Sequence, residues 1–296
     1  MQILHLTDRQ LPFDLDITLS CGQVFRWMKK ENIWTGIVRG RIITISKTGR
    51  EIWYSGFTRE ELIHYLALDI EPSLILADIR ATITQFTGLE SDTVFEKAIR
   101  AGGGLRVIRQ EPWECLISYI CSQNSNIPAI KKRINLIAHQ YGRLLGDDLY
   151  SFPDPQELAE CKSATLRECG SGYRADYILQ ASTHIAQNPS FLTSLNSLSV
   201  PQARRHLLSL HGVGPKVADC ILLFAYQQYA VVPVDVWIRT LITTCYPQVK
   251  ERALGRKECS YNDIAQYCQD LFGSYAGYAQ QYLFAARESL MAGSKL

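Results

Sequence analysis

The sequence predicts an α+β protein: a small N-terminal antiparallel β-sheet domain followed by a larger, all-helical body. Short β-rich runs separated by glycine turns occupy residues 33–54, and helical periodicity continues from about residue 90 to the end. The length of 296 residues suggests about two domains. We place them at 1–112 and 113–296, with strands and helices largely segregated along the chain.

The predicted sheet is an antiparallel meander. Its runs of isoleucine, threonine and aromatic residues are separated by turns at Gly40 and Gly49, which is typical of strands joined by hairpins. Directly after them, Thr58 and Glu61 have the spacing of a capping box, so a helix is expected to begin there.

Helical periodicity recurs through the rest of the chain, between breaks rich in glycine or proline. The predicted helical segments are 95–99, 113–122, 127–140, 175–186, 201–210, 216–226 and 275–291. Because no internal repeat or long linker separates them, we expect these helices to pack on one another as one body.

Composition excludes several classes of protein. With 47% hydrophobic and 20% charged residues the chain can bury a core, and no apolar run approaches the roughly 18 residues of a membrane span. The first ten residues do not resemble a secretory signal, so we expect an intracellular protein without a membrane partner. Nine cysteines without a CxxC pair predict neither a disulfide framework nor a metal site. A net charge of +2 leaves nucleic acid open as a partner.

The most informative stretch is residues 207–220, LLSLHGVGPKVADC. One helix ends, a glycine hairpin follows, and Pro215 occupies the first turn of the next helix. Gly212 and Gly214 permit unusual φ values and close approach of the backbone to another molecule. N–H groups beside a helix N-terminus form an anion site that suits a phosphate. A plain αα turn is the alternative.

Lys216 and Asp235 are the candidate catalytic pair. Lys216 lies at the positive end of its helix, where the ammonium is disfavoured and a nucleophilic amine is favoured, although a surface lysine that contacts phosphate is the simpler interpretation. Asp235 stands in the apolar stretch 231–237, where an unpaired carboxylate is costly. Its structural alternative is the N-cap of a helix that begins near Trp237.

Hairpin, lysine and aspartate together resemble the helix-hairpin-helix DNA glycosylase superfamily. The resemblance is to the 8-oxoguanine DNA glycosylase/AP lyases with an N-terminal β domain, and it extends from about residue 14 to 288. Four further segments carry it: CGQVFRW at 21–27, CSQNSNI at 121–127, GYRA at 172–175 and YAGYAQQYLF at 275–284. It implies that Lys216 attacks the sugar C1′ as a Schiff-base nucleophile, that Asp235 assists base loss, and that β-elimination then cleaves the strand.

The same resemblance implies a base-binding pocket. Gly22 matches the glycine whose carbonyl accepts the N7–H of 8-oxoguanine, a proton that guanine lacks. Phe284 and Cys220 match the residues on either side of the flipped base, and Gln280 matches the reader of its Watson–Crick edge. From the residues alone, Gly22 is a turn glycine, Phe284 and Cys220 are core residues, and Gln280 is a surface amide.

The resemblance also implies DNA-contacting side chains. Asn124 matches the wedge that fills the emptied base stack, and Tyr173 and Arg174 match residues beside the orphaned base. Two positions depart from the family pattern. Ala129 replaces an arginine that contacts the cytosine opposite the lesion, which puts cytosine preference in doubt, and Trp237 replaces a histidine. Both departures resemble a bacterial-type variant.

The implied partner is double-stranded DNA that contains 8-oxoguanine, bound by a monomer at an intracellular, DNA-associated location. No cofactor is required, and a structural monovalent cation at the hairpin is left open. Two rival functions remain: an alkylated-base glycosylase on the same scaffold, which Lys216 disfavours, and a non-catalytic helix-hairpin-helix DNA-binding module, which needs neither Asp235 nor a base pocket.

Overall fold

The computed structural model describes residues 1–292, which form two compact units. Unit 1 contains Met1–Leu6, Gly22–Leu66 and Ile108–Tyr226, and unit 2 contains the described residues of Thr7–Cys21, Ala67–Val107 and Gln227–Leu296. The units are therefore interleaved along the chain. The consecutive division into 1–112 and 113–296 stays a prediction.

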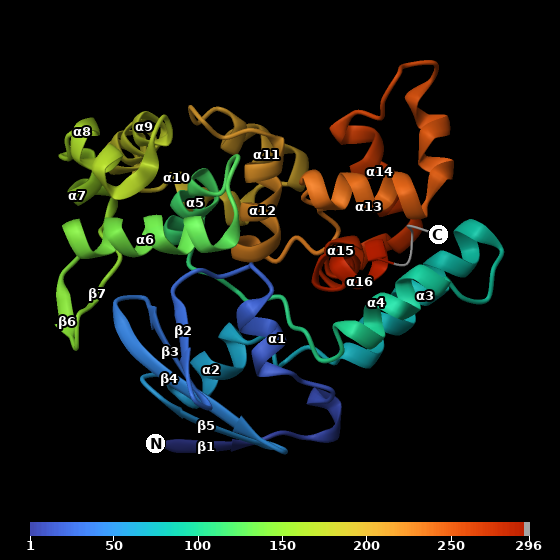
Figure 1. The fold of residues 1–296 in the computed structure, drawn as a ribbon, viewed down its shortest axis with the longest axis horizontal. Coiled ribbons are helices and arrows are strands. Elements are labelled where there is room, and N and C mark those ends of the chain that lie inside the picture. Colours follow the sequence, from blue (N-terminus) through green and yellow to red (C-terminus); the bar gives the residue numbers. More distant parts are fainter. Residues whose placement is uncertain (293–296) are drawn as a thin grey trace. The chain divides into compact units, whose positions relative to one another are not determined.

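Unit 1 contains the predicted antiparallel sheet, whose five strands follow the order β1-β5-β4-β3-β2 (Figure 1). The strands are β1 (Gln2–His5), β2 (Trp27–Lys30), β3 (Ile33–Val38), β4 (Arg41–Thr48) and β5 (Glu51–Ser55). The meander of β3, β4 and β5 agrees with the sequence prediction. The two edge strands were not predicted, because most of their residues are exposed and leave no alternating apolar pattern.

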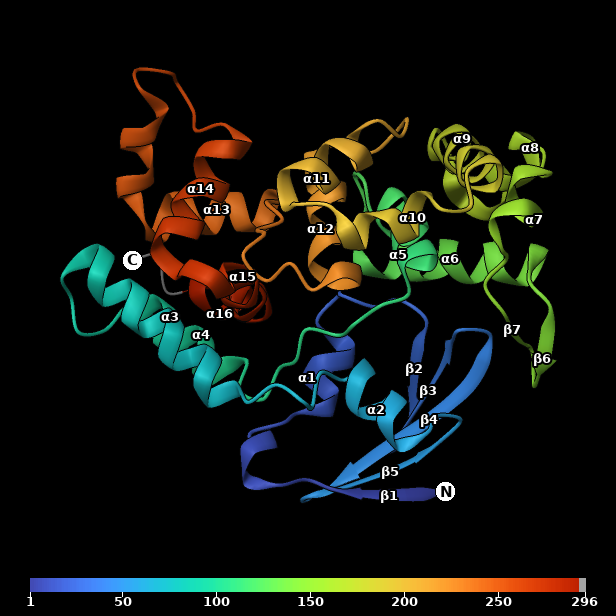
Figure 2. The ribbon, with the colours of Figure 1, turned by 180° about the vertical axis from the view of Figure 1, so that it is seen from behind.

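One glycine determines how the sheet packs beside α2 (Arg59–Tyr65), the helix that begins at the predicted capping box. Gly36 of β3 pairs with Trp27 of β2, and a Cβ atom at Gly36 would lie 2.4 Å from the indole ring. The missing side chain leaves room for Trp27, whose Nε1 donates a hydrogen bond to the Tyr65 hydroxyl at 2.8 Å. Helix α2 lies beside the sheet in both Figure 1 and Figure 2.

The remaining helices of unit 1 come from its longest stretch of chain. They are α5 (Pro112–Cys121), α6 (Ile127–Tyr141), α7 (Pro155–Ala159), α8 (Ser163–Leu166), α9 (Arg174–Gln187), α10 (Phe191–Ser194), α11 (Val200–Leu208) and α12 (Pro215–Tyr226). Every residue of α12 from Val217 onward is buried, and the helix packs against α5 and α11. Apart from Asp219, which pairs with Arg204, these buried residues are apolar, and a helix that is apolar on most sides requires such enclosure.

The helical region contains one departure from the all-helical prediction. A short hairpin pairs β6 (Leu144–Gly146) with β7 (Leu149–Tyr150). Its turn residues, Asp147 and Asp148, have φ values of 47° and 59°. Positive φ at both central residues is the hallmark of a two-residue hairpin turn, and aspartate tolerates it better than most residues.

Unit 2 is helical. Its α-helices are α1 (Leu15–Ser20), α3 (Pro72–Thr87), α4 (Thr93–Ala101), α13 (Val236–Cys245), α14 (Tyr261–Phe272), α15 (Ala276–Ala285) and α16 (Arg287–Ala292). Helix α14 packs on α3, α15 on α4, and α13 on α16. Neither α3 nor α14 was predicted. The single helical segment predicted at 275–291 is interrupted at Ala286, between α15 and α16.

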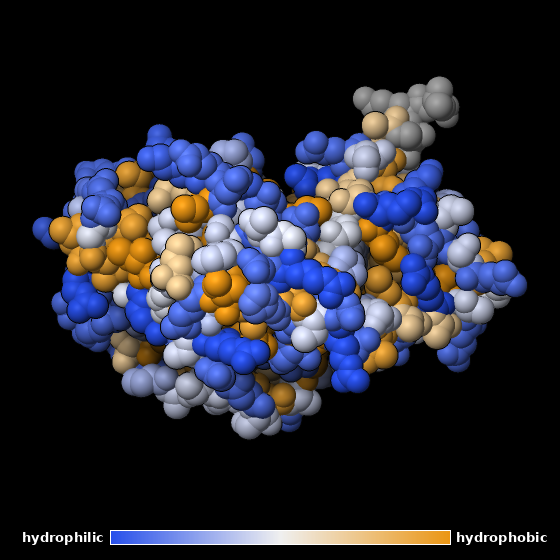
Figure 3. Space-filling view, turned by 90° about the horizontal axis from the view of Figure 1, so that it is seen from below, coloured by the Kyte–Doolittle hydropathy of each residue, from blue (hydrophilic) through white to orange (hydrophobic). Residues whose placement is uncertain are grey.

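Shorter helical turns complete the described chain. They are the 3-10 segments Asp8–Gln10, Leu195–Ser197, Pro247–Ala253 and Gly273–Tyr275 and the π segment Arg167–Ser171. Within residues 1–292, no helix has the length and apolar character needed to cross a membrane. On the face drawn in Figure 3, hydrophobic residues form separate patches among hydrophilic ones.

Candidate active site

The helix-hairpin-helix is present as predicted, with α11 and α12 joined by residues 209–214 and α12 beginning at Pro215. Gly212 has φ of +82°, and a Cβ there would lie 2.3 Å from Cγ of Tyr177. Its carbonyl accepts a hydrogen bond from Gln123 Nε2 at 2.9 Å. Gly214 differs, because its φ lies outside the positive range and a Cβ there would meet nothing within 4 Å. Gly212 therefore uses the conformational freedom of glycine, whereas at Gly214 the backbone faces open space.

Lys216 lies in the first turn of α12, as expected, and is half-buried. Its Nζ donates a hydrogen bond to Ser122 Oγ at 2.9 Å and lies 4.9 Å from the centroid of the Tyr119 ring. The Ser122 hydroxyl donates its own proton to the Tyr119 carbonyl at 2.8 Å. The end of α5 thus fixes the direction of the amine. Cys220 follows four residues later on the same side of the helix and is only 2% exposed.

Gly22 has φ of +92°, a conformation that side-chain-bearing residues rarely adopt. The next residue, Gln23, is buried and held at both its amide and its backbone. Gln23 Oε1 accepts a hydrogen bond from the Ile108 N–H at 2.8 Å. The Gln23 carbonyl accepts from Gln110 Nε2 at 2.6 Å and from the Tyr119 hydroxyl at 3.2 Å. The segment that carries Gly22 is therefore fixed directly after the glycine.

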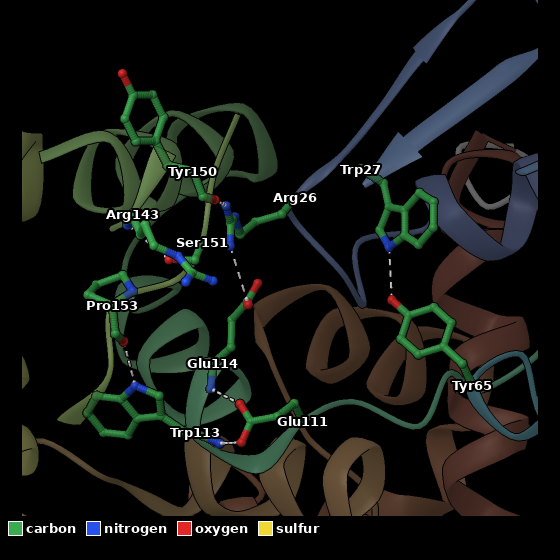
Figure 4. A network of polar contacts seen from close by, with 10 residues as sticks. All are labelled: Arg26, Trp27, Tyr65, Glu111, Trp113, Glu114, Arg143, Tyr150, Ser151 and Pro153. Carbon is green, nitrogen blue, oxygen red and sulfur yellow. Dashed lines mark hydrogen bonds and ion pairs between the residues drawn. The ribbon is translucent and has the colours of Figure 1, made fainter. Parts of the chain in front are cut away.

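A second set of polar contacts holds the same segment further along (Figure 4). The Arg26 guanidinium donates to the Tyr150 carbonyl and lies 3.5 Å from Glu114 Oε2 of α5. Burial raises the pKa of Glu114 to about 7, and the charge of Arg26 opposes that shift. The network joins the predicted base-reading segment to the helix that orients Lys216.

The three predicted DNA-contacting side chains are close together. Asn124 has φ of +45°, and its Nδ2 donates a hydrogen bond to the Tyr173 hydroxyl at 3.1 Å. Arg174 is buried, and its Nε donates to the Gln123 carbonyl at 2.8 Å. The Arg174 guanidinium also lies 4.5 Å from the centroid of the Tyr173 ring, which is 44% exposed. Arg174 thus braces the loop that carries Asn124.

Three predicted site residues, Asp235, Gln280 and Phe284, lie in unit 2. Asp235 is the N-cap of α13, as its structural interpretation predicted, and its Oδ1 accepts a hydrogen bond from Ile238 N at 2.8 Å. Gln280 is 4% exposed, so the expectation of a surface amide is wrong. Its Oε1 accepts from Gln281 Nε2 at 2.7 Å.

Phe284 lies on α15 and is half-buried beneath a charged side chain. The Arg287 guanidinium lies 4.3 Å from the centroid of the Phe284 ring and 5.7 Å from that of Trp237. Trp237 is 48% exposed. The guanidinium therefore links the two aromatic side chains by cation–π contacts.

The part of the chain that the structure describes contains no group of three or more histidine, cysteine, aspartate or glutamate residues arranged to hold a metal ion. This finding concerns side chains only and does not test the prediction that no cofactor is required, because a cation at the hairpin would be bound by backbone carbonyls.

Comparison with known proteins shows the family to which this chain belongs. The family model for the N-terminal domain of 8-oxoguanine DNA glycosylase matches residues 4–116, and that for helix-hairpin-helix base excision DNA repair proteins matches 117–257. The N-glycosylase/DNA lyase of Saccharomyces cerevisiae is 30% identical over 93% of this chain and 84% of its own. The Arabidopsis thaliana enzyme is 31% identical over 96% and 79%. The chain belongs to the helix-hairpin-helix family of 8-oxoguanine DNA glycosylase/lyases.

A solved structure of the family supports the fold over nearly the whole chain. The Clostridium acetobutylicum 8-oxoguanine glycosylase/lyase, in complex with double-stranded DNA containing cytosine opposite 8-oxoguanine, has a TM-score of 0.82. It is 31% identical, and the match covers 98% of each chain. The predicted family and its fold of N-terminal sheet and mostly helical body are therefore confirmed. The roles of individual residues stay predictions.

Sequence reasoning missed the side chains that support the candidate site. Ser122 and Gln123 lie inside the motif at 121–127, but nothing in the sequence relates them to Lys216 or Gly212. In the sequence, Tyr119 is one of several apolar residues of the predicted helix 113–122. The hydrogen bonds from Gln123 to Gly212 and from Lys216 to Ser122 join residues 89 and 94 positions apart, so no local sequence pattern indicates them.

Proposed function

We propose that this protein excises 8-oxoguanine from double-stranded DNA and then cleaves the abasic strand by β-elimination. The observation that carries the proposal is the half-buried Lys216 directly behind the hairpin, with its amine held by Ser122. A lysine that only contacted phosphate would need neither partial burial nor an aligned partner within the protein.

The proposed reaction begins with the Lys216 amine next to C1′ of the damaged nucleotide. The lone pair of Lys216 Nζ forms a bond to C1′ as the bond from C1′ to the base breaks, and the base leaves with the electron pair. Asp235 stabilises the positive charge that develops on the sugar and accepts a proton from the amine. The sugar ring of this adduct then opens: the C1′–O4′ bond breaks, O4′ takes up a proton, and the nitrogen lone pair forms the C=N bond of a Schiff base. The Schiff base acidifies the neighbouring C2′ position, whose proton is lost as the 3′ phosphate departs with the electrons of its bond to C3′.

Base recognition is assigned to the remaining candidates. The Gly22 carbonyl accepts the N7–H of 8-oxoguanine, Gln280 reads the Watson–Crick edge, and Cys220 and Phe284 contact the faces of the base. The buried position of Gln280 supports a reading role more than a surface position would. A buried amide discriminates strongly, since a mismatched partner leaves it unpaired.

DNA binding is assigned to the hairpin and to the loop of Asn124. The open space at Gly214 leaves room for a phosphate beside the N-terminus of α12. Asn124 and Tyr173 enter the stack that the flipped base vacates. Because the Ala129 side chain offers no hydrogen-bond donor, we propose weaker preference for cytosine opposite the lesion. The protein acts as a DNA-associated monomer, and no cofactor takes part in these steps.

Borohydride trapping on a duplex with one 8-oxoguanine tests the proposal. Wild type is expected to form a covalent adduct that Lys216→Gln abolishes. Lys131→Gln is the matched control, because Lys131 is also half-buried and burial lowers its pKa, so it is the chemically plausible rival amine. Loss of the adduct in Lys131→Gln alone, or its retention in Lys216→Gln, would refute the assignment. Parallel duplexes with cytosine and adenine opposite the lesion test the role of Ala129.

A further inference from the structure

The reading and reacting parts of unit 1 belong to different segments of the chain. Gly22 precedes β2, whereas Lys216 lies in the first turn of α12. If both act on one nucleotide, as the proposed function requires, their relative position must hold to a fraction of an ångström, because misplaced reacting groups lose much of their rate advantage. A residue that contacts both segments would fix this relative position directly.

Tyr119 of α5 makes those contacts. It is 3% exposed, and its hydroxyl donates to the Gln23 carbonyl at 3.2 Å. Its ring lies 5.8 Å from that of Phe25, edge to face, and is stacked on Phe224 at 5.4 Å with an interplanar angle of 7°. Lys216 Nζ lies 4.9 Å from the same ring centroid. One side chain thus contacts the base-reading segment through its hydroxyl and the nucleophile through its π face.

The hydroxyl and the ring have separable effects. The ring is held by aromatic packing on α12 and on the reading segment, so it stays in place when the hydroxyl is removed. The hydroxyl donates to the Gln23 carbonyl, as does Gln110 Nε2. That carbonyl belongs to the peptide between Gln23 and Val24, which adjoins the Gly22–Gln23 peptide at the Gln23 Cα, so fixing it restricts the direction of the Gly22 carbonyl.

We propose that Tyr119 is a positioning residue that aligns the Gly22 carbonyl with the Lys216 amine, its hydroxyl acting on base recognition and its ring on the nucleophile. The inference rests on the proposed function and deepens it. It predicts that recognition of the lesion and cleavage of the abasic strand respond differently to changes at this one position.

The test is Tyr119→Phe, measured under single-turnover conditions on two duplexes. One contains 8-oxoguanine opposite cytosine, and the other contains a preformed abasic site, which needs Lys216 but no reading of a base. Losing one hydrogen bond to a backbone carbonyl is expected to slow base release roughly fivefold. Cleavage at the preformed abasic site is expected to stay within about twofold of wild type, since the ring beside Lys216 remains.

Tyr226→Phe is the matched control. Tyr226 is a buried tyrosine of α12 whose hydroxyl also donates to a backbone carbonyl, that of Leu192 at 2.7 Å. It removes a comparable hydrogen bond from the same unit and is expected to leave the ratio of the two rates unchanged. Tyr119→Leu removes the ring as well and is expected to slow both reactions.

The ratio of base release to cleavage at the preformed abasic site distinguishes the outcomes. An unchanged ratio in Tyr119→Phe, or an equal change in Tyr226→Phe, would overturn the positioning role while leaving the proposed function intact. Wild type that releases no 8-oxoguanine would overturn the proposed function, and the inference with it. A thermal unfolding curve for each variant separates a change in ratio from a loss of folded protein, because unfolding lowers both rates equally.

Discussion

Gly212→Ala should destabilise the protein through two separate costs at the hairpin. The left-handed conformation at φ of +82° costs a residue with a Cβ about 1–2 kcal/mol. The added Cβ also meets Cγ and Cβ of Tyr177 at 2.3 and 2.5 Å. These atoms are at the backbone end of the tyrosine and cannot swing away, so overpacking adds about 1–3 kcal/mol. We expect a total loss of about 3 kcal/mol in the free energy of unfolding.

Gly214→Ala provides the matched comparison two residues away. Its φ needs no glycine, and a methyl group there meets nothing within 4 Å. The substitution also reduces the freedom of the unfolded chain, so stability should change by less than about 1 kcal/mol. The methyl group would enter the space that we assign to a DNA phosphate, and affinity for duplex DNA should fall roughly tenfold.

Two measurements separate the glycines: urea unfolding followed by circular dichroism, and binding of a fluorescent duplex at fixed salt concentration. Gly212→Ala should shift the unfolding midpoint, whereas Gly214→Ala should shift the dissociation constant of folded protein. Equal destabilisation by both variants would show that the steric reasoning is wrong. Normal DNA binding by Gly214→Ala would refute the placement of a phosphate at that position.

Two further predictions concern the surroundings of Lys216 and Glu114. Ser122→Ala removes the acceptor of the Lys216 amine and should slow borohydride trapping about tenfold with little change in DNA affinity; an equal loss of affinity would contradict a role confined to the amine. The pKa of Glu114 in the folded protein, about 7, lies above the ordinary value of 4.5. The protonated carboxyl group therefore contributes fully to stability below about pH 4.5, and this contribution is lost as the pH rises through 7. Glu114→Gln, which mimics the protonated acid, should therefore gain about 3 kcal/mol relative to wild type between pH 4.5 and 8, as measured by urea unfolding; a difference that does not vary with pH would refute the shift.

The elements that sequence reasoning predicted correctly are those specified by neighbouring residues. The capping box at Thr58, the first-turn proline at Pro215 and the N-cap at Asp235 all act within a few positions of their helix starts. In β4 and β5, buried residues alternate with more accessible ones over most of the strand, which periodicity detects. Local chemistry and local pattern were sufficient there.

The elements that were missed depend on partners distant in the sequence. Strand β1 has one buried residue and pairs with β5, about 50 positions away, so its own residues give little indication of a strand. Helix α3 does carry a periodic signal, with Ile75, Ile79 and Ile83 on one buried face.

The candidate site divides in the same way. The residues that local motifs and family resemblance supplied, such as Lys216 and Gly22, are those expected to touch DNA, and their motifs are contiguous in sequence. The residues that hold them, Tyr119 and Ser122, act from another helix. A base-reading carbonyl and a nucleophilic amine discriminate between substrates only when both are held still relative to one nucleotide. Determinants of substrate preference that differ between relatives are therefore expected among such neighbours in space, where a single hydroxyl can change alignment while every motif residue stays the same.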